Sequence, residues 1–420
     1  QVTGTLTVDL TSTSANTTIE AGAARIVTLT DAGSGGVTVN QTNVGTSVSG
    51  TTDNEISVDG DGDVANDVAT VSSNGVVSLE TAATDQVENI TLSGNSQSAT
   101  YTLTAGNAPE KVTFAGDQDV TLVMAALDAT TETFVNNLTG DATATVRINA
   151  DDTADLSKVA TSIVIDIADG TTGGDTYSLA DNATVKVTAA TTTATLDSTV
   201  ATNGTTETLN LIIDDTGNQT TFDVSDFEVV NISGSDTSAT VAGDGIATIA
   251  TLTGAATTAC VASGSVNLTL GSTAATAKSI DASALTGKLV TTMSANSKIV
   301  TGGEGNDTIT GYAGNMTIDG NGGSDTLVFA AAADLTGATL SITDLETVSI
   351  TAAGAVTLEM NASDVTGEAW IVKGTGTEDT LDVTLDSASV DLSGLVIDDT
   401  TVAVTYTDDE ICACFAAGCF

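Results

Sequence analysis

Apolar and polar residues alternate along most of the chain, and helical spacing of apolar residues is scarce. The alternation is clear in residues 2–8, 183–187 and 266–270. A period of two is typical of strands that bury one face. Clusters of Gly, Asn, Asp and Ser separate these segments, and such clusters are typical of turns. The pattern therefore predicts an all-β fold built from short strands.

A short motif, in which a glutamate precedes an alternating strand, recurs through the chain. Its copies begin at Glu88, Glu110, Glu132, Glu207, Glu228 and Glu346. The first three are 22 residues apart, and the next two are 21 apart. A repeat of this length fits one coil of a parallel β-solenoid or β-roll. The alternative is chance similarity within a low-complexity sequence.

These patterns divide the chain into four regions. Residues 1–80 lack the glutamate-led repeat, so they form either a separate β-sandwich-like region or the first, irregular coils. Residues 81–300 are predicted as the solenoid with repeats of 21–22 residues. Residues 301–330 are a block of glycine-rich turns, and residues 331–420 are further coils that end in a cysteine-containing tail.

The charge of the chain limits the classes of molecule that it is expected to bind. The formal net charge is −46, there is no histidine, and aromatic residues make up only 3%. Such a chain repels itself unless salt, divalent cations or an extended shape offset the charge. Nucleic acids and anionic membranes are not expected as partners, because both require Lys and Arg. No apolar run reaches the roughly 18 residues of a transmembrane segment.

Three consecutive nonapeptides fill residues 302–328, and each begins with glycine. The sixth position is Asp in repeats one and three and Met316 in repeat two, and the eighth is always Ile or Leu. Aspartate and turn carbonyl oxygens suit Ca²⁺. Glycine permits the positive φ angles that we expect in such turns. The candidate calcium-binding residues are Gly302, Gly303, Gly305, Asp307, Gly320, Gly322, Gly323 and Asp325.

Two nonapeptides are expected to complete one coil, so that repeats one and three stack. Asp307 and Asp325 are then predicted to face each other across one calcium ion. Because Met316 replaces the aspartate in repeat two, that side of the coil is predicted to bind calcium weakly or not at all. The sequence thus predicts one good site in this block.

Weaker candidates for calcium binding lie elsewhere. Turns at residues 170–177 and 374–381 keep the spacing from glycine to aspartate and contribute Asp175 and Asp379. Three alternating aspartates in a glycine-rich loop form another candidate, without the closing glutamate of an EF-hand. They are Asp59, Asp61 and Asp63. For each of these turns, the alternative is an ordinary acidic turn.

The four cysteines allow three interpretations. They are Cys260, Cys412, Cys414 and Cys419. The first is a soft-metal site. The second is a disulfide, formed within the tail, with Cys260 or between subunits. The third is that the cysteines are small apolar residues in a buried tail.

Residues 302–329 resemble the calcium-binding nonapeptide repeat of RTX proteins. The Thr/Ala/Gly/Asp-rich, Lys-poor composition and the run at 281–287 are similar to those of bacterial RTX-type S-layer proteins. This resemblance implies type I secretion with an uncleaved C-terminal signal and folding outside the cell, where calcium is abundant. It also implies a place at the cell surface and calcium-dependent lattice formation.

Two functional hypotheses follow. The first is a calcium-dependent structural protein that assembles with itself into an extracellular surface layer, sheath or filament. The second is a secreted RTX-type adhesin that binds cell surfaces or glycans, with cell-surface polysaccharide as a partner. An enzyme is not expected, because zinc proteases of the His-Glu-x-x-His type and Ser-His-Asp hydrolases need the histidine that this chain lacks.

Overall fold

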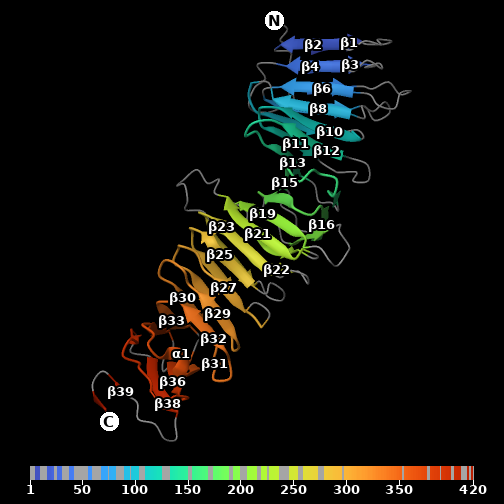
Figure 1. Ribbon diagram of the computed structural model, residues 1–420. Helices are drawn as coiled ribbons and strands as arrows, with labels where there is room; N and C mark the ends of the chain where they lie inside the picture. Colours follow the sequence, from blue (N-terminus) through green and yellow to red (C-terminus); the bar gives the residue numbers. More distant parts are fainter. Residues whose placement is uncertain are drawn as a thin grey trace. The chain divides into compact units, whose positions relative to one another are not determined.

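The structure of the chain is a computed structural model (Figure 1). The residues that it describes are 5–9, 17–22, 26–30, 37–41, 55–58, 68–73, 75–81, 89–94, 96–103, 109–124, 133–149, 154–168, 174–188, 193–198, 206–214, 219–224, 227–235, 246–253, 259–272, 279–295, 298–351, 354–375, 379–387, 389–398, 402–407, 414–415 and 418–419. The chain forms two compact units, Gln1–Asn210 and Leu211–Phe420.

The first unit is a parallel β-solenoid in which the chain alternates between two walls. One wall contains β1 (Thr5–Asp9), β3 (Ile26–Thr30), β5 (Glu55–Val58), β7 (Val76–Thr81), β9 (Ala99–Leu103), β11 (Val120–Met124), β13 (Ala144–Ile148), β15 (Ile163–Ile167) and β17 (Ala183–Val187). The other contains β2 (Thr17–Gly22), β4 (Val37–Gln41), β6 (Val68–Ser73), β8 (Asn89–Gly94), β10 (Lys111–Gly116) and β12 (Thr133–Leu138), and then β14 (Ala154–Asp155), β16 (Gly174–Leu179) and β18 (Thr193–Ser198).

The second unit is built in the same way. One sheet contains β21 (Val229–Ser235), β23 (Ala259–Gly264), β25 (Ser279–Leu285), β27 (Ile299–Thr301), β29 (Met316–Asp319) and β32 (Leu340–Thr343). Its partner contains β20 (Gln219–Asp223), β22 (Ile246–Thr253), β24 (Asn267–Ser272), β26 (Leu289–Thr292), β28 (Thr308–Thr310), β30 (Thr326–Phe329), β33 (Thr347–Ile350), β35 (Ile371–Gly374) and β37 (Val396–Ile397). Strand β19 (Thr208–Asp214) contains the boundary between the units.

The remaining elements of the second unit lie towards the end of the sequence. A small parallel sheet contains β31 (Ala333–Asp334), β34 (Thr357–Asn361), β36 (Asp379–Thr384) and β38 (Val402–Thr407). The short helix α1 (Ala362–Val365) follows β34, and β39 (Cys414–Phe415) pairs antiparallel with β40 (Gly418–Cys419). Among the described residues, no helix is long and apolar enough to cross a membrane.

The predicted repeat length is confirmed as one coil of the solenoid. Strands β8, β10 and β12 are neighbours in one sheet, and Lys111 lies opposite both Asn89 and Thr133. Each of these strands follows one of the first three repeat glutamates. Residues one repeat apart therefore stack directly on one another, as parallel pairing requires.

The N-terminal region continues the same architecture. Strand β1 pairs parallel with β3, β3 with β5, and β5 with β7. Of the two alternatives for residues 1–80, the described strands therefore form solenoid coils and not a separate sandwich. In the second unit, the ladders β27–β29–β32 and β28–β30–β33 run past residues 301 and 330 without interruption.

The core is a thin stack of aliphatic side chains. In β9, β13 and β17 every second residue is buried, as the alternating pattern predicted. Several aromatic residues also pack inside: Tyr101, Tyr177 and Trp370 are at most 1% exposed. The Tyr101 hydroxyl donates a hydrogen bond to the Ser93 carbonyl at 2.8 Å, so its polar end is satisfied within the core.

Candidate calcium-binding turns

The three nonapeptides form one coil and a half, as predicted. Their strands are β28, β29 and β30, and β29 belongs to the opposite sheet from the other two. Strands β28 and β30 pair directly, with Thr308 opposite Thr326. The eighth residues, Ile309, Ile318 and Leu327, are buried. The turn of repeat one therefore stacks on the turn of repeat three.

Acidic side chains tie successive turns together. The Asp307 carboxylate accepts the N–H groups of Leu289 (2.7 Å) and Gly303 (2.6 Å). The Asp325 carboxylate accepts the N–H of Asp307 at 2.7 Å, and the Glu346 carboxylate accepts the N–H of Asp325 at 2.6 Å. Asp307, Asp325 and Glu346 thus form an acidic ladder, in which each side chain reaches back by one coil.

The ladder corrects the expected orientation of the two aspartates. Asp307 and Asp325 do not face each other, because the Asp325 side chain bonds to the backbone of Asp307 while the Asp307 side chain bonds to the preceding coil. Parallel stacking repeats the same local conformation in each coil, so equivalent side chains point in the same direction. Backbone carbonyl oxygens of the next coil lie close to each carboxylate.

Close stacking is the main reason for glycine in these turns. Of the predicted glycines, Gly323 has a left-handed φ of +116°; the non-glycine Asn321 also has a positive φ, 65°. A Cβ atom would overlap a backbone carbonyl of an adjacent coil at five positions, Gly302, Gly303, Gly305, Gly320 and Gly323. At Gly322 the three nearest atoms all belong to Glu304, and the nearest is a side-chain oxygen at 3.2 Å. The expectation of positive φ throughout the turns was therefore wrong.

Because both aspartates of the block are buried, an isolated negative charge on either side chain is energetically unfavourable. Asp307 and Asp325 are each 1% exposed. Burial raises the pKa of Asp307, against hydrogen bonds from Leu289 and Gly303 and the charge of Lys288. Burial also raises the pKa of Asp325 to about 6, and the negative charges of Asp307, Glu346 and Asp344 add to the shift in this pKa. A cation beside Asp325 would remove this penalty.

The turn of repeat two is closed by its own side chains. Met316 is buried in the core instead of pointing into the turn. The Tyr312 hydroxyl donates to the Asn315 carbonyl at 2.6 Å, and the Asn315 side chain accepts the N–H of Thr339 at 2.8 Å. This arrangement agrees with the prediction of weak or absent calcium binding on this side, which stays a prediction.

The weaker candidates differ in their surroundings. Asp379 is fully buried, accepts the N–H of Val356 at 3.2 Å, and lies 2.7 Å from the position of a Cβ on Gly374. It thus repeats the relation of Asp307 to Gly302, but no backbone carbonyl is among the three atoms nearest that Cβ position. Asp175 is buried within β16 and not in a turn. Residues 170–173, and Asp59, Asp61 and Asp63, lie outside the described residues.

Sequence reasoning missed the third member of the ladder. Glu346 precedes β33 directly, just as Asp307 precedes β28 and Asp325 precedes β30. The signal was present in the glutamate-led repeat, because Glu346 begins one of its copies. It was interpreted as the start of a strand and not as a continuation of the acidic turns.

Cys260 is a core residue. It lies in β23, is fully buried and unpaired, and burial raises the pKa of its thiol to about 12. A buried thiol of this kind behaves as a small apolar side chain. The backbone of β39 and β40 places Cys414 opposite Cys419, and Cys412 lies outside the described residues.

The residues of the stacked turns fit a calcium ion. One oxygen of the buried Asp325 carboxylate, Oδ2, has no hydrogen-bond partner. Carboxylate and carbonyl oxygens are the ligands that Ca²⁺ prefers. Within the described part of the chain, no three acidic, histidine or cysteine side chains converge on a metal position. Backbone carbonyl oxygens must therefore supply much of the coordination, and a bound ion would offset the charge of the ladder.

Comparison with known proteins agrees with this geometry. The family model described as the RTX calcium-binding nonapeptide repeat (4 copies) matches residues 299–334, from the start of β27 to the end of β31. The match begins before the three nonapeptides of residues 302–328 and ends after them. Neither the curated proteins nor the solved structures gave a significant match. RTX nonapeptide repeats bind calcium, and this chain accordingly contains a calcium-binding block of RTX repeats.

Proposed function

We propose that this chain is a calcium-dependent structural protein that assembles with itself into an extracellular surface layer, sheath or filament. Proteins with RTX repeats are typically secreted into calcium-rich surroundings. A location at the cell surface belongs to the proposal. So does the absence of enzymatic activity, which the lack of histidine supports.

The observation that carries the proposal is the edge of the long sheet in the second unit. Strand β37 is the last strand of that sheet among the described residues, and it pairs with β35. Val396 and Ile397 on β37 are 54% and 39% exposed. An exposed apolar edge strand is a template for pairing with another chain. A strand from a second copy would extend the sheet by the same parallel pairing that builds the solenoid.

Calcium has a clear part in such an assembly. A net charge of −46 opposes the approach of identical chains. Ions bound in the stacked turns reduce that charge and stabilise the folded coils by mass action. A contact between this edge and a different surface of the next copy is heterologous, so it repeats from copy to copy and builds an open filament or layer and not a closed dimer.

Calcium titration with negative-stain electron microscopy tests the role of the edge. We expect ordered sheets or filaments from the wild-type protein on addition of calcium, with reversal by EDTA. Val396→Lys combined with Ile397→Lys places two charges on the edge. Assembly should then require a protein concentration on the order of tenfold higher or more. The circular dichroism response to calcium should remain.

Ile299→Lys is the matched control for this experiment. Ile299 is 46% exposed, but β27 lies between two other strands of its sheet, so the edge is untouched. This variant should assemble as the wild type does. If the double variant also assembles normally, β37 is not the contact. If calcium orders the wild-type chain but only separate particles appear, the adhesin is the better interpretation.

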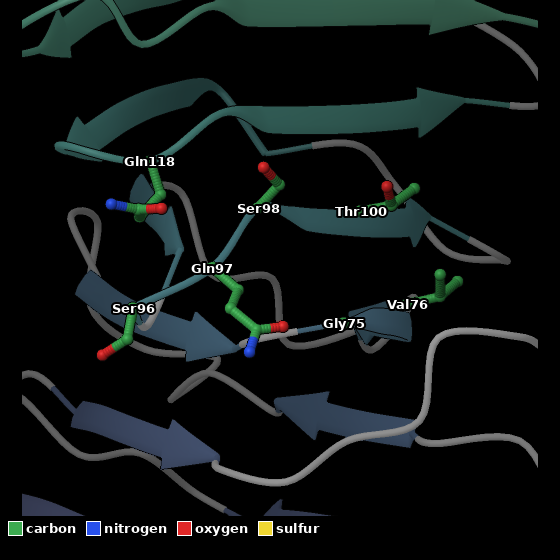
Figure 2. A pocket seen from close by; sticks show the side chains of 7 residues that line it. All are labelled: Gly75, Val76, Ser96, Gln97, Ser98, Thr100 and Gln118. Atoms are coloured by element: carbon green, nitrogen blue, oxygen red, sulfur yellow. The ribbon is translucent and has the colours of Figure 1, made fainter.

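A second candidate function, a secreted adhesin for cell-surface glycans, is favoured by a hollow in the first unit. The hollow has a volume of about 450 Å³ and is lined by Gly75, Val76, Ser96, Gln97, Ser98, Thr100 and Gln118 (Figure 2). No charged residue lines it, although the chain is strongly acidic. Hydroxyl and amide groups are the partners that neutral polysaccharides need for hydrogen bonds.

Binding to immobilised neutral polysaccharides tests this alternative. Gln97→Ala together with Gln118→Ala removes both amide side chains of the hollow, so affinity should fall roughly tenfold or more. Thr145→Ala in β13, outside the hollow, is the control and should bind as the wild type does. If no polysaccharide binds, or if the double variant binds equally well, the hollow is not a glycan site.

A further inference from the structure

The unsatisfied oxygen of Asp325 lies at the end of the nonapeptide block, next to the following coil. Oδ1 of Asp325 accepts the N–H of Asp307, but Oδ2 has no hydrogen-bond partner. The residue is 1% exposed. A buried carboxylate oxygen is unfavourable without a hydrogen-bond donor or a cation. We therefore expect one of these beside Oδ2 of Asp325.

The surroundings of this oxygen repeat those of the preceding coil. Beside Gly302, the position of a Cβ atom lies against Oδ2 of Asp307 and 2.5 Å from the carbonyl oxygen of Gly320. Beside Gly320, the same position lies 2.6 Å from Oδ2 of Asp325 and against the carbonyl oxygen of Asp344. A carboxylate oxygen and a carbonyl oxygen of the next coil thus converge twice. Asp344 supplies the second carbonyl, although it lies outside the residues matched by the RTX model.

One difference separates the two positions. In repeat one, the N–H of Gly303 satisfies Oδ2 of Asp307. In repeat three, the corresponding N–H belongs to Asn321 and is donated to the Asp319 side chain at 3.1 Å. Oδ2 of Asp325 is therefore left for another partner, and the converging carbonyl oxygen cannot be that partner because it is also an acceptor.

The turn that carries Asp344 is held firmly in place. Asp344 has a left-handed φ of 50°, which is uncommon for a residue other than glycine. The N–H of Gly320 donates to the Thr343 carbonyl at 3.0 Å. Glu346 is anchored through its hydrogen bond from the N–H of Asp325. The turn therefore presents the Asp344 carbonyl oxygen and the Glu346 carboxylate towards Asp325.

We propose that Asp344 and Glu346 form, together with Asp325, a calcium site that closes the nonapeptide block on the side of the following coils. Its ligands are Oδ2 of Asp325, the carbonyl oxygen of Asp344 and the carboxylate of Glu346. The inference rests on the calcium dependence in the proposed function but not on self-assembly. Such an ion joins the RTX turns to coils whose sequence no longer follows the nonapeptide pattern.

Hydrogen–deuterium exchange on the wild-type protein, in excess calcium and in EDTA, tests the site without any substitution. We expect calcium to slow exchange in residues 340–347 as well as in residues 302–326. Protection of residues 302–326 alone would overturn the proposed site and leave the calcium dependence of the block intact. Absence of protection in both segments would overturn the site and that calcium dependence together.

Calorimetric titration of the full chain with calcium supplies the second test. Glu346→Gln keeps an oxygen for the N–H of Asp325 but removes the charge, so the variant should bind one calcium ion fewer, or bind it at least roughly tenfold more weakly. Glu359→Gln in β34 makes the same charge change away from the turns and should bind as the wild type does. Equal binding by Glu346→Gln and the wild type would overturn the proposal. Circular dichroism in calcium confirms that both variants are folded.

Discussion

Replacement of Asp307 and Asp325 together by asparagine will raise the calcium concentration needed to order the second unit by about two orders of magnitude or more. Both carboxylates are buried, and each ties its turn to the preceding coil. Asparagine keeps the size of each side chain and one acceptor oxygen, so the contact of Asp325 and one of the two contacts of Asp307 can persist. The main loss is that of the two negative charges that attract the cation. Far-UV circular dichroism during a calcium titration measures the shift.

A variant with the same change in net charge provides the control. Asp117→Asn with Asp141→Asn alters two exposed aspartates of the first unit, far along the sequence from the stacked turns. This variant should respond to calcium at the wild-type concentration. If Asp307→Asn with Asp325→Asn also responds there, the nonapeptide turns are not the calcium switch of this protein. The weaker turn at Asp379 would then be the next to replace.

Stability without calcium will fall as the pH rises from about 4 to about 6. The pKa of Asp325 is raised to about 6 in the folded chain, mainly by burial, from its ordinary value of 3.8. Between these values the folded state binds more protons than the unfolded state, so the free energy of unfolding decreases with rising pH. The decrease from this one group is at most about 3 kcal/mol. The raised pKa of Asp307 acts in the same direction.

Calcium will reverse this trend. The ion takes the place of the proton at Asp325, so apparent calcium affinity should increase as the pH rises through about 6 and then level off. Denaturant unfolding between pH 4 and 8, with and without calcium, measures both effects. Asp325→Asn should flatten the calcium-free profile over the same pH range. A calcium-free stability that rises with pH over this range, or an unchanged profile in the variant, would contradict the assignment to Asp325.

The acidic ladder connects these two predictions with the folding of the protein. Buried carboxylates that reach back to the preceding coil set the register of the stacked turns, but their charge destabilises the same turns when no cation is present. We propose that calcium turns this conflict into a condition for folding. A chain that ordered only where calcium is abundant would stay loosely structured where free calcium is scarce, as suits a secreted protein with RTX repeats.

The sequence by itself determined the features that depend on local pattern. Alternation predicted strands such as residues 183–187, which form β17 with the same bounds. The spacing of the glutamate-led repeats predicted the length of a coil, because residues one coil apart must have equivalent neighbours. The nonapeptides predicted calcium turns, since glycine and aspartate at fixed positions meet both the steric and the ligand requirements of such turns.

The contacts between one coil and the next were decided only by the tertiary structure. The direction of the Asp307 and Asp325 side chains depends on which backbone N–H groups the preceding coil presents. The reason for glycine at position 320 is a carbonyl oxygen of Asp344, a full coil away in sequence. Glu346 joined the ladder because parallel stacking places it over Asp325, although its motif differs. These contacts arise between residues distant in sequence, and so a local pattern cannot specify them.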